Sequence, residues 1–221
     1  VTDRGIGESD NQVERILCIN ADTGEQAWEH SYEVNYNDDE YNIGYKAGPR
    51  AAVTIHSGKA IAVGAMGDMK CLNAATGNII WEHRLAKEYK AKMPIWGITA
   101  APLVHENLVI QIAAGSDGAC VVAFNLETGK EAWRAIDELA GYSAPIIVRQ
   151  GKQDVAVCWT GESVTGLNPQ TGSTLWRLPM KSRNMPIGVA TPEDIDRLLD
   201  AVSALVDPCD LSLHLHDTAG S

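Results

Sequence analysis

Up to residue 187, the hydrophobic residues of the chain occur in short runs that are separated by turns rich in Gly, Asn and Thr. Two of these runs are CVVAFN (120–125) and DVAVCW (154–159), and both combine β-branched and aromatic residues as buried strands do. Each run is about four to eight residues long, which suits a strand better than a helix. This pattern predicts an all-β fold of short antiparallel strands.

From residue 188 the pattern changes to that of a helix. Apolar residues recur at helical spacing with charged residues between them; they are Ile195, Leu198, Leu199, Val202 and Leu205. We therefore predict an amphipathic helix over 192–206, followed by a short alternating strand, LSLHLHD (211–217). The chain then divides into a β-rich domain, 1–187, and a helix–strand appendage from a different, α/β fold, 188–221.

Within the β-rich part, the pattern Asn-x-x-Thr-Gly-x-x-x-Trp occurs four times, with Trp-to-Trp spacings of 53, 52 and 43 residues. The four copies are NADTGEQAW (20–28), NAATGNIIW (73–81), NLETGKEAW (125–133) and NPQTGSTLW (168–176). In such a tight turn, Asn tolerates a left-handed conformation and Gly adopts a positive φ without steric cost. The Trp should lie on the returning strand, where it can dock against a neighbouring unit.

The same residues therefore recur as structural markers in each unit: Gly24, Gly77, Gly129 and Gly172 in the turns, and Trp28, Trp81, Trp133 and Trp176 on the returning strands. Pro102 and Pro145 each precede the Asn of their own turn by 23 residues, so a new unit should open after each proline. Each unit has room for four short antiparallel strands. Units of about 45 residues with four strands are the signature of a β-propeller blade.

These repeats resemble the PQQ-like, or quinoprotein-like, β-propeller family, which includes proteins similar to an outer-membrane assembly factor. The resemblance covers about residues 13–192 and implies a partial β-propeller of four-stranded antiparallel blades. The family forms rings of seven or eight blades, so we expect about three and a half blades here and a chain that is part of a longer one. The resemblance also implies tryptophan docking between blades and a periplasmic or cell-envelope location.

Composition narrows the possible partners. The 221 residues are 45% hydrophobic, which is enough for a buried core, and the net charge of -11 argues against nucleic acid as a partner. No run approaches the roughly 18 apolar residues of a membrane span. The opening VTDRGIGESDNQ lacks the basic and apolar regions of a signal peptide. The five cysteines are not spaced as a disulfide framework or a zinc site, so we expect small buried residues.

Two classes of function remain for the propeller: a non-catalytic binding or assembly scaffold, and a fragment of a quinone-dependent dehydrogenase. The resemblance implies that such dehydrogenases carry adjacent cysteines beside the quinone and a bound calcium. This chain has no adjacent cysteine pair, and Asp38, Asp39 and Glu40 fall in a hydrophilic run typical of a solvated loop. We therefore expect no catalysis, no PQQ and no other cofactor in the propeller, and a protein partner or another ligand at its face.

Other residues with possible chemistry lie between the repeats. The loop 86–97 mixes lysines with Tyr89, Met93 and Trp96, so it is either a binding surface or a spacer whose Trp96 packs on the neighbouring blade. His56, His83 and His105 have no ligand spacing among them, which favours structural roles.

In the tail, alternation along the strand places His214 and His216 on one face, followed by Asp217. The run IGVATPEDIDRLLDAV…LSLHLHDTAG resembles a short piece, about 186–221, of hydroxymethylglutaryl-coenzyme A lyase, a TIM-barrel metallolyase. The resemblance implies that the two histidines bind a divalent metal. Two ligands do not complete such a site, so the tail should be inactive alone. Two unrelated coding fragments joined near 188–192 and a genuine gene fusion are both open explanations.

Overall fold

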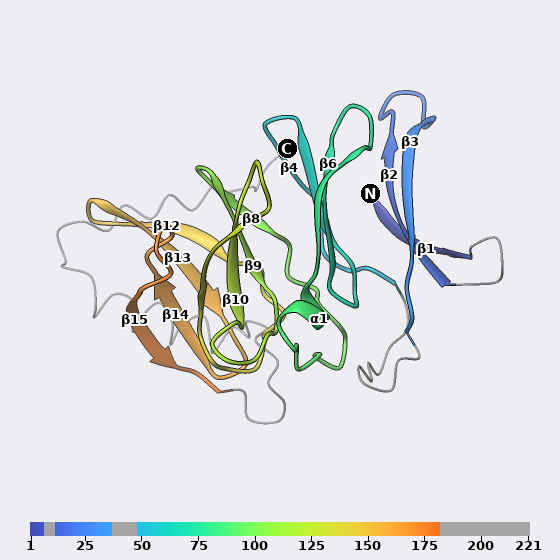
Figure 1. Cartoon of the computed structure of the whole chain (residues 1–221). Helices are drawn as coiled ribbons and strands as arrows, with labels where there is room; N and C mark the ends of the chain where they lie inside the picture. Colours follow the sequence, from blue (N-terminus) through green and yellow to red (C-terminus); the bar gives the residue numbers. More distant parts are fainter. Residues whose placement is uncertain (7–11, 37–47, 182–221) are drawn as a thin grey trace, which may run out of the picture.

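The computed structural model of the chain describes residues 1–6, 12–36 and 48–181, which form four antiparallel sheets arranged in chain order (Figure 1). We call these sheets blades 1 to 4. The acids Asp38, Asp39 and Glu40 lie outside the described residues, and so do the predicted helix over 192–206, Cys209 and the histidines His214 and His216.

Each strand pairs with the next strand in the sequence, so every blade is a simple meander. Blade 1 contains β1 (Thr2–Ile6), β2 (Gln12–Ile19) and β3 (Gln26–Glu33), and blade 2 contains β4 (Thr54–His56), β5 (Lys59–Val63), β6 (Asp68–Asn73) and β7 (Ile79–Arg84). Blade 3 contains β8 (Leu103–His105), β9 (Leu108–Ile112), β10 (Val121–Asn125) and β11 (Glu131–Ala135). Blade 4 contains β12 (Ile146–Gln150), β13 (Gln153–Trp159), β14 (Ser163–Leu167) and β15 (Thr174–Pro179). A single-turn helix, α1 (Leu85–Glu88), follows β7.

The predicted fold class is confirmed: the described part is a partial β-propeller of antiparallel blades. Blades 2 to 4 have the predicted four strands, and β8 and β12 begin directly after Pro102 and Pro145. Blade 1 departs from the prediction with three strands, because no described strand pairs with the free edge of β1. The helix α1 also departs from an all-strand interpretation, although it is only four residues long.

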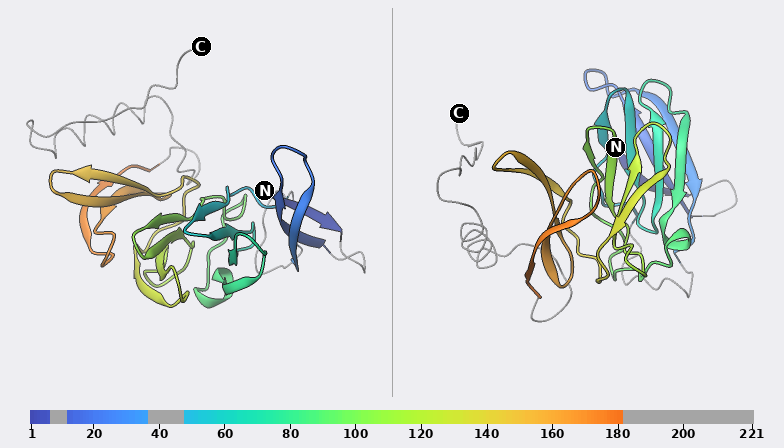
Figure 2. Two further views of the ribbon diagram at one scale, coloured as in Figure 1. Left: turned by 90° about the horizontal axis from the view of Figure 1, so that it is seen from above. Right: turned by 60° about the vertical axis from the view of Figure 1, so that its left-hand side comes forward.

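The hydrophobic core lies between the blades, whose sheets stack face to face in a row (Figure 2). Every residue of β5, β9 and β14 is buried. Neighbouring blades cover both faces of β5 and β9, whereas Trp176 of the same blade lies against Gly166 of β14. The last strand of a blade is more exposed and alternates with the period of two that a half-covered strand requires, as in β3. One cluster fills each blade junction; that between blades 1 and 2 contains Ile16, Ala60, Ala62 and Leu72.

Each repeat turn is closed by side-chain and backbone hydrogen bonds of the same kind. In the turn of blade 2, the Oδ1 atom of Asn73 accepts hydrogen bonds from the N–H groups of Ala75 (2.9 Å) and Thr76 (3.1 Å). The N–H of Gly77, at a φ of 74°, donates to the carbonyl of Asn73 (2.8 Å). The positive φ expected of Gly is confirmed, whereas the Asn is not left-handed; it acts instead as an acceptor that closes an Asx turn.

Candidate functional site

Tryptophan docking joins successive blades. The indole N–H of Trp28 donates to the carbonyl of Ala74 (3.0 Å), that of Trp81 to Leu126 (2.9 Å) and that of Trp133 to Pro169 (3.0 Å). Each acceptor follows the Asn of the next blade's turn. A Cβ atom added to the Gly of that turn would lie 2.6–2.7 Å from the indole, at Gly77, Gly129 and Gly172. The turn residue therefore has to be glycine, because any Cβ atom would occupy the space that the indole of the preceding blade fills.

A small residue stands opposite each Trp on the neighbouring strand: Cys18, Cys71, Ala123 and Gly166 pair with the four tryptophans in turn. This position explains two of the cysteines, because a larger side chain would collide with the indole. Cys71, Cys120 and Cys158 are buried, as predicted, and Cys18 is partly buried. Burial raises the pKa of Cys71 to about 11 and that of Cys158 to about 12. Both thiols therefore stay protonated and unreactive at neutral pH.

The loop 85–102 connects blade 2 to blade 3, and hydrogen bonds attach it to blade 3 at several points. Tyr89 is buried, and its hydroxyl donates to Glu131 (2.8 Å) on β11. The N–H of Lys92 donates to the carbonyl of Ala114 (2.9 Å), and the N–H of Ser116 donates to the carbonyl of Tyr89 (2.9 Å). The backbone of this loop is thus fixed against blade 3.

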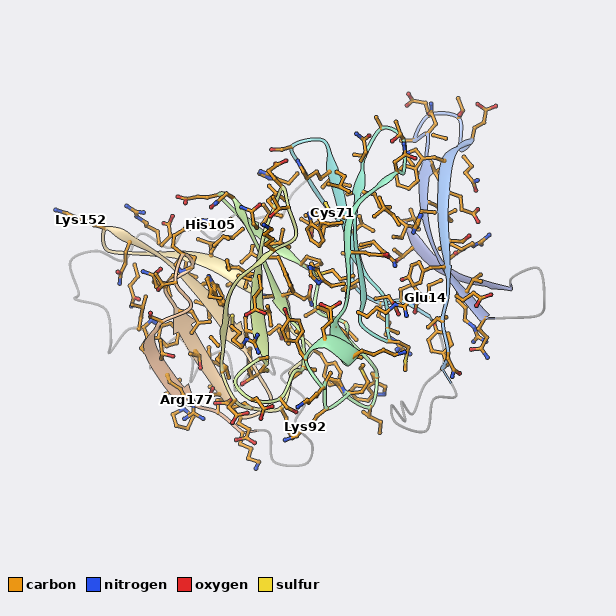
Figure 3. The ribbon with its side chains drawn as sticks, in the orientation of Figure 1. Glu14, Cys71, Lys92, His105, Lys152 and Arg177 are labelled. Carbon is orange, nitrogen blue, oxygen red and sulfur yellow. The ribbon has the colours of Figure 1, made fainter. Side chains whose placement is uncertain are left out.

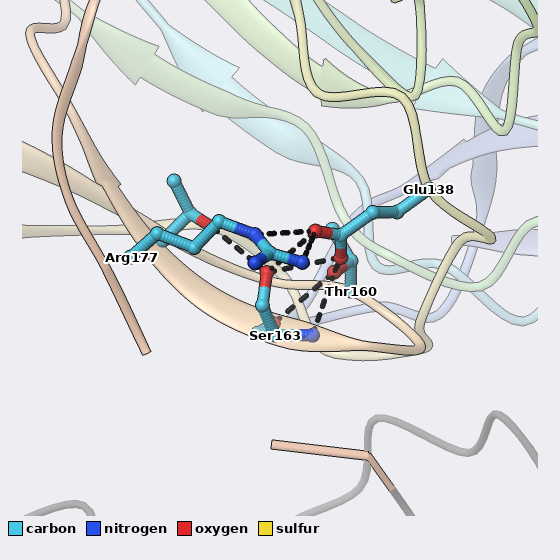
Figure 4. Close-up of polar contacts among 5 residues, drawn as sticks. Glu138, Thr160, Ser163 and Arg177 are labelled. Atoms are coloured by element: carbon cyan, nitrogen blue, oxygen red, sulfur yellow. Dashed lines mark hydrogen bonds and ion pairs between the residues drawn. The ribbon is translucent and has the colours of Figure 1, made fainter. Parts of the chain in front are cut away.

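A second long loop, 136–145, connects blade 3 to blade 4 and is anchored by Glu138 (Figure 4). The carboxylate, 6% exposed, accepts hydrogen bonds from the hydroxyl of Ser163 (2.9 Å) and the guanidinium Nε of Arg177 (2.7 Å). The hydroxyl of Thr160 donates to the same carboxylate. Because the charge is paired and each oxygen has donors, this cluster locks the loop onto blade 4.

The two loops meet through their aromatic residues. The rings of Trp96 and Tyr142 lie 5.0 Å apart, and the hydroxyl of Thr99 donates to the carbonyl of Tyr142 (3.1 Å). Trp96 thus packs on the next interblade loop, as the spacer interpretation predicts, and its ring stays partly exposed, so both interpretations of the loop 86–97 remain open. Ile95 is 42% exposed beside this pair.

We call the surface formed by 86–97 and 136–145 the loop end of the propeller. Lys87, Lys90 and Lys92 are exposed on it, although the chain as a whole is strongly acidic. In Figure 3, Lys92 marks the loop end at the bottom of the view, and Lys152 lies at the upper left, far from the loop end. The loop end thus combines rigid backbone with partly exposed aromatic and aliphatic side chains. Its exposed charges are the three lysines and two acids, Glu88 and Asp137.

A second buried carboxylate ties blade 1 to blade 2. Glu14, labelled in Figure 3, is fully buried. It accepts hydrogen bonds from the hydroxyls of Tyr32 (2.7 Å) and Tyr36 (2.5 Å) and from the N–H of Ala65 (3.1 Å). Burial raises the pKa of Tyr32 and of Tyr36 well above the usual range. Both hydroxyls therefore keep their protons and remain donors to the carboxylate.

A cleft of about 580 Å³ with a mixed polar and apolar lining lies beside the first docking contact, between blades 1 and 2. Its lining includes Ile16, Cys18, Trp28, Ile55 and Ala60. The lining also includes polar residues, among them Thr2 and Arg50.

Two of the histidines considered in the sequence, His83 and His105, form contacts with groups of neighbouring segments. His83 contacts Glu88 through Nδ1 (2.7 Å) and the carbonyl of Gly129 through Nε2 (2.8 Å). His105 pairs with Asp154 (3.6 Å) on the next blade. Across 1–6, 12–36 and 48–181, no three His, Cys, Asp or Glu side chains are grouped as a metal site.

Glu14 and Glu138 could not be singled out from the sequence. Each is a single acid whose partners come from other segments, and neither belongs to the repeat pattern. An acidic residue in a run that otherwise reads as a buried strand was the only signal for Glu14.

The fold and the repeated docking contact define the class of protein. It is a β-propeller in which a Trp side chain of one blade packs on the turn glycine of the next blade. The family model described as outer membrane protein assembly factor BamB matches residues 12–202, and the chain belongs to that family. No curated protein sequence matches the chain. Among the described residues, no helix is long and apolar enough to cross a membrane.

Solved structures share the fold at low sequence identity. BamB from Moraxella catarrhalis is 17% identical with a TM-score of 0.53, over 78% of this chain and 50% of that one. Quinohemoprotein alcohol dehydrogenase from Comamonas testosteroni is 18% identical with a TM-score of 0.57, over 76% of this chain and 32% of that one. The chain thus spans half or less of the length of these proteins. The comparisons concern the propeller, and the lyase-like interpretation of 186–221 stays a prediction.

Proposed function

We propose that the propeller part of the chain is a non-catalytic scaffold that binds another protein at its loop end, in the cell envelope. The observation that carries this proposal is the loop end itself, where two long loops are locked to the blades and still present Ile95, Trp96 and Tyr142. Rigid aromatic residues are enriched at protein interfaces because they bury much area at a small entropic cost. The family description, an outer membrane protein assembly factor, supports the assembly role and the location.

The charge of the loop end suggests the partner's chemistry. Lys87, Lys90 and Lys92 would favour a partner segment with acidic residues beside an apolar anchor, since complementary charge steers association. The partner would place its apolar side chain against Trp96 and Tyr142 and its acids near the lysines.

The test uses the whole gene that encodes this chain, expressed in a strain that lacks the wild-type copy. The test variant carries Trp96→Ala with Lys87→Glu, Lys90→Glu and Lys92→Glu, and the readout is the amount of folded outer-membrane protein in the envelope. The wild-type gene should restore this amount and the variant should not, although it folds. The matched control carries Lys130→Glu and Lys152→Glu at the opposite end and should restore it fully. Equal restoration by the test variant would contradict the proposal.

The dehydrogenase alternative rests on a fold that the family shares, because similarity at 18% identity concerns the fold alone. It predicts that the full-length protein, supplied with PQQ and calcium, reduces an electron-acceptor dye when an alcohol is added. We expect no such reduction. For the tail, the pair His214 and His216 stays a proposed, incomplete site for a divalent metal, testable by titration with Mn²⁺ and a His214→Ala variant.

A further inference from the structure

His83 connects three segments of the chain at the junction of blades 2 and 3. It lies on β7 two residues after the docking Trp81, and its ring stacks on Phe124 of β10, with the ring centres 4.3 Å apart. Its Nε2 atom lies 2.8 Å from the carbonyl oxygen of Gly129, the glycine on which Trp81 docks. Its Nδ1 atom lies 2.7 Å from Oε2 of Glu88 in α1. The side chain therefore connects the docking turn of blade 3 to the helix at which the loop end begins.

Both partners of the His83 ring can only accept hydrogen bonds, because a carbonyl oxygen and an ionised carboxylate have no proton to donate. A neutral imidazole has one N–H group, so it satisfies one of the two partners and turns a lone pair toward the other. The doubly protonated ring has an N–H group on each nitrogen and satisfies both. The geometry around His83 therefore matches the charged form of the ring.

Two carboxylates lie near the His83 ring, that of Glu88 from α1 and that of Glu131 from β11. Glu131 accepts hydrogen bonds from the guanidinium of Arg134 (2.9 Å) and from the hydroxyl of Tyr89 (2.8 Å). These two partners already stabilise the charge of Glu131. Glu88 is thus the carboxylate that the ring itself binds.

The other charged residues of the surrounding segments are turned away from the ring or bound elsewhere. Alternation along β6 and β7 places their charged side chains on the opposite face, toward blade 1. These residues are Asp68, Lys70, Glu82 and Arg84. On the docking turn, Glu127 pairs with Lys59 (2.7 Å), and Lys130 is exposed. The Glu88 contact is therefore the one that a proton on His83 controls most directly.

The same repeat position in blade 1 holds a histidine in different surroundings. His30 also follows its docking Trp by two residues, but its Nε2 atom is buried and has no hydrogen-bond partner among the described residues. Burial lowers the pKa of His30, and the nearby ammonium of Lys70 lowers it further. Blade 1 thus favours a neutral ring at the position where blade 2 surrounds the ring with two acceptors.

We propose that His83 is a proton-dependent latch, whose charged ring fixes α1, and with it the start of the loop end, to the docking turn of blade 3. When the ring loses a proton, the remaining N–H stays with Gly129, because that contact is partly buried whereas the Glu88 side chain is 42% exposed. Glu88 then faces a lone pair and turns toward water. The hold on α1 is present while the ring is protonated and is lost as the pH rises through about pH 5 to 8, where histidine changes charge. The latch acts on the loop end whether or not a partner binds there.

The test is amide hydrogen exchange of the full chain, followed by NMR at about pH 5.5 and about pH 8 and corrected for the intrinsic exchange rate at each pH. Two amides report on α1. The N–H of Arg84 donates to Oε1 of Glu88 (2.7 Å), and the N–H of Tyr89 donates to the carbonyl of Leu85 (3.0 Å). Protection of both should be about threefold to fivefold lower at the higher pH, as for loss of a partly exposed ion pair. Equal protection at the two pH values would overturn the proposal.

Two variants test the two sides of the latch. His83→Gln should abolish the pH dependence, because no titrating ring remains between α1 and the docking turn. Glu88→Gln should abolish it as well, because an amide can accept from the protonated ring and donate to the neutral one. The Glu88 side chain is exposed, so this variant decides the matter even if His83→Gln does not fold. A pH dependence of the wild-type size in Glu88→Gln would overturn the proposal.

The matched control is His30→Gln, which removes a histidine from the same repeat position in blade 1. This variant should keep the wild-type difference in protection of the Arg84 and Tyr89 amides between the two pH values. Loss of the difference in His30→Gln would assign the pH dependence to blade 1 and would likewise overturn the proposal.

Discussion

At the scale of single residues, the docking tryptophans should dominate the stability of the propeller. Trp133 is 7% exposed, packs on the turn of blade 4 and hydrogen-bonds to Pro169. Trp133→Ala should lower the free energy of unfolding by about 3–5 kcal/mol, because it leaves a large cavity between two blades. Urea denaturation measures this loss, and a loss below about 1 kcal/mol would show that Trp133 is not a docking residue. Trp176→Ala should cost less, since the Trp176 indole is bound only within its own blade.

The turn glycine beneath each indole should be sensitive for two separate reasons. Gly129 has a φ of 70°, and a Cβ there would lie 2.7 Å from the Trp81 ring, so Gly129→Ala combines backbone strain with a steric clash. Gly118→Ala is the control, because Gly118 has a φ of 79° and nothing lies within 4 Å of its added Cβ. The control should lose about 1 kcal/mol from strain alone, and Gly129→Ala should lose clearly more in the same denaturation experiment. Equal losses would mean that Trp81 moves aside freely.

At the scale of elements, the pairing of β6 with β7 should depend on pH. The ammonium of Lys70, 5% exposed, donates to Glu82, and this hydrogen bond together with its charge lowers the pKa of Glu82 below its usual range. A lowered pKa means that the stabilisation is complete above the pKa of the unfolded chain and is lost as the pH falls through the folded value. The Glu82 side chain is half exposed, so solvent screening limits the effect to about 1 kcal/mol or less.

Glu82→Gln tests this dependence. It should lower stability at pH 7 and lower it less at pH 3, because the wild-type carboxyl becomes protonated as the pH falls through its folded pKa. Glu29→Gln, at the equivalent place in blade 1, should change little, because its nearest cation, Arg15, is 3.8 Å away and partly exposed. A loss for Glu82→Gln that is the same at both pH values would mean that shape rather than charge matters at this position.

The strands and turns that could be predicted from the sequence are those that belong to the repeated pattern. The four Trp strands, the Gly turns and the strands after Pro102 and Pro145 follow from local turn chemistry and from a pattern that occurs in every blade. The helix α1 and the three-stranded sheet that the described residues of blade 1 form have no such pattern behind them. Glu14 and Glu138 depend on hydroxyl donors that only the folded chain brings near, such as Tyr36 and Thr160, so no local signal could locate them.

At the scale of the whole molecule, stability should fall from the middle of the row of blades to its ends. Blades 2 and 3 are covered on both faces, whereas blades 1 and 4 each have an outer face on which described apolar residues such as Ile19 are exposed. In stacked repeats, stability is close to a sum of repeat and neighbour terms, so an end blade lacks one stabilising interface. The end blades should therefore open before the middle ones.

Native-state amide hydrogen exchange measures this gradient. We expect β9 and β10 to exchange only through global unfolding, and β2 and β14 to exchange through local opening of lower free energy. Uniform protection of all four blades at low concentration would show that some other contact covers the end faces.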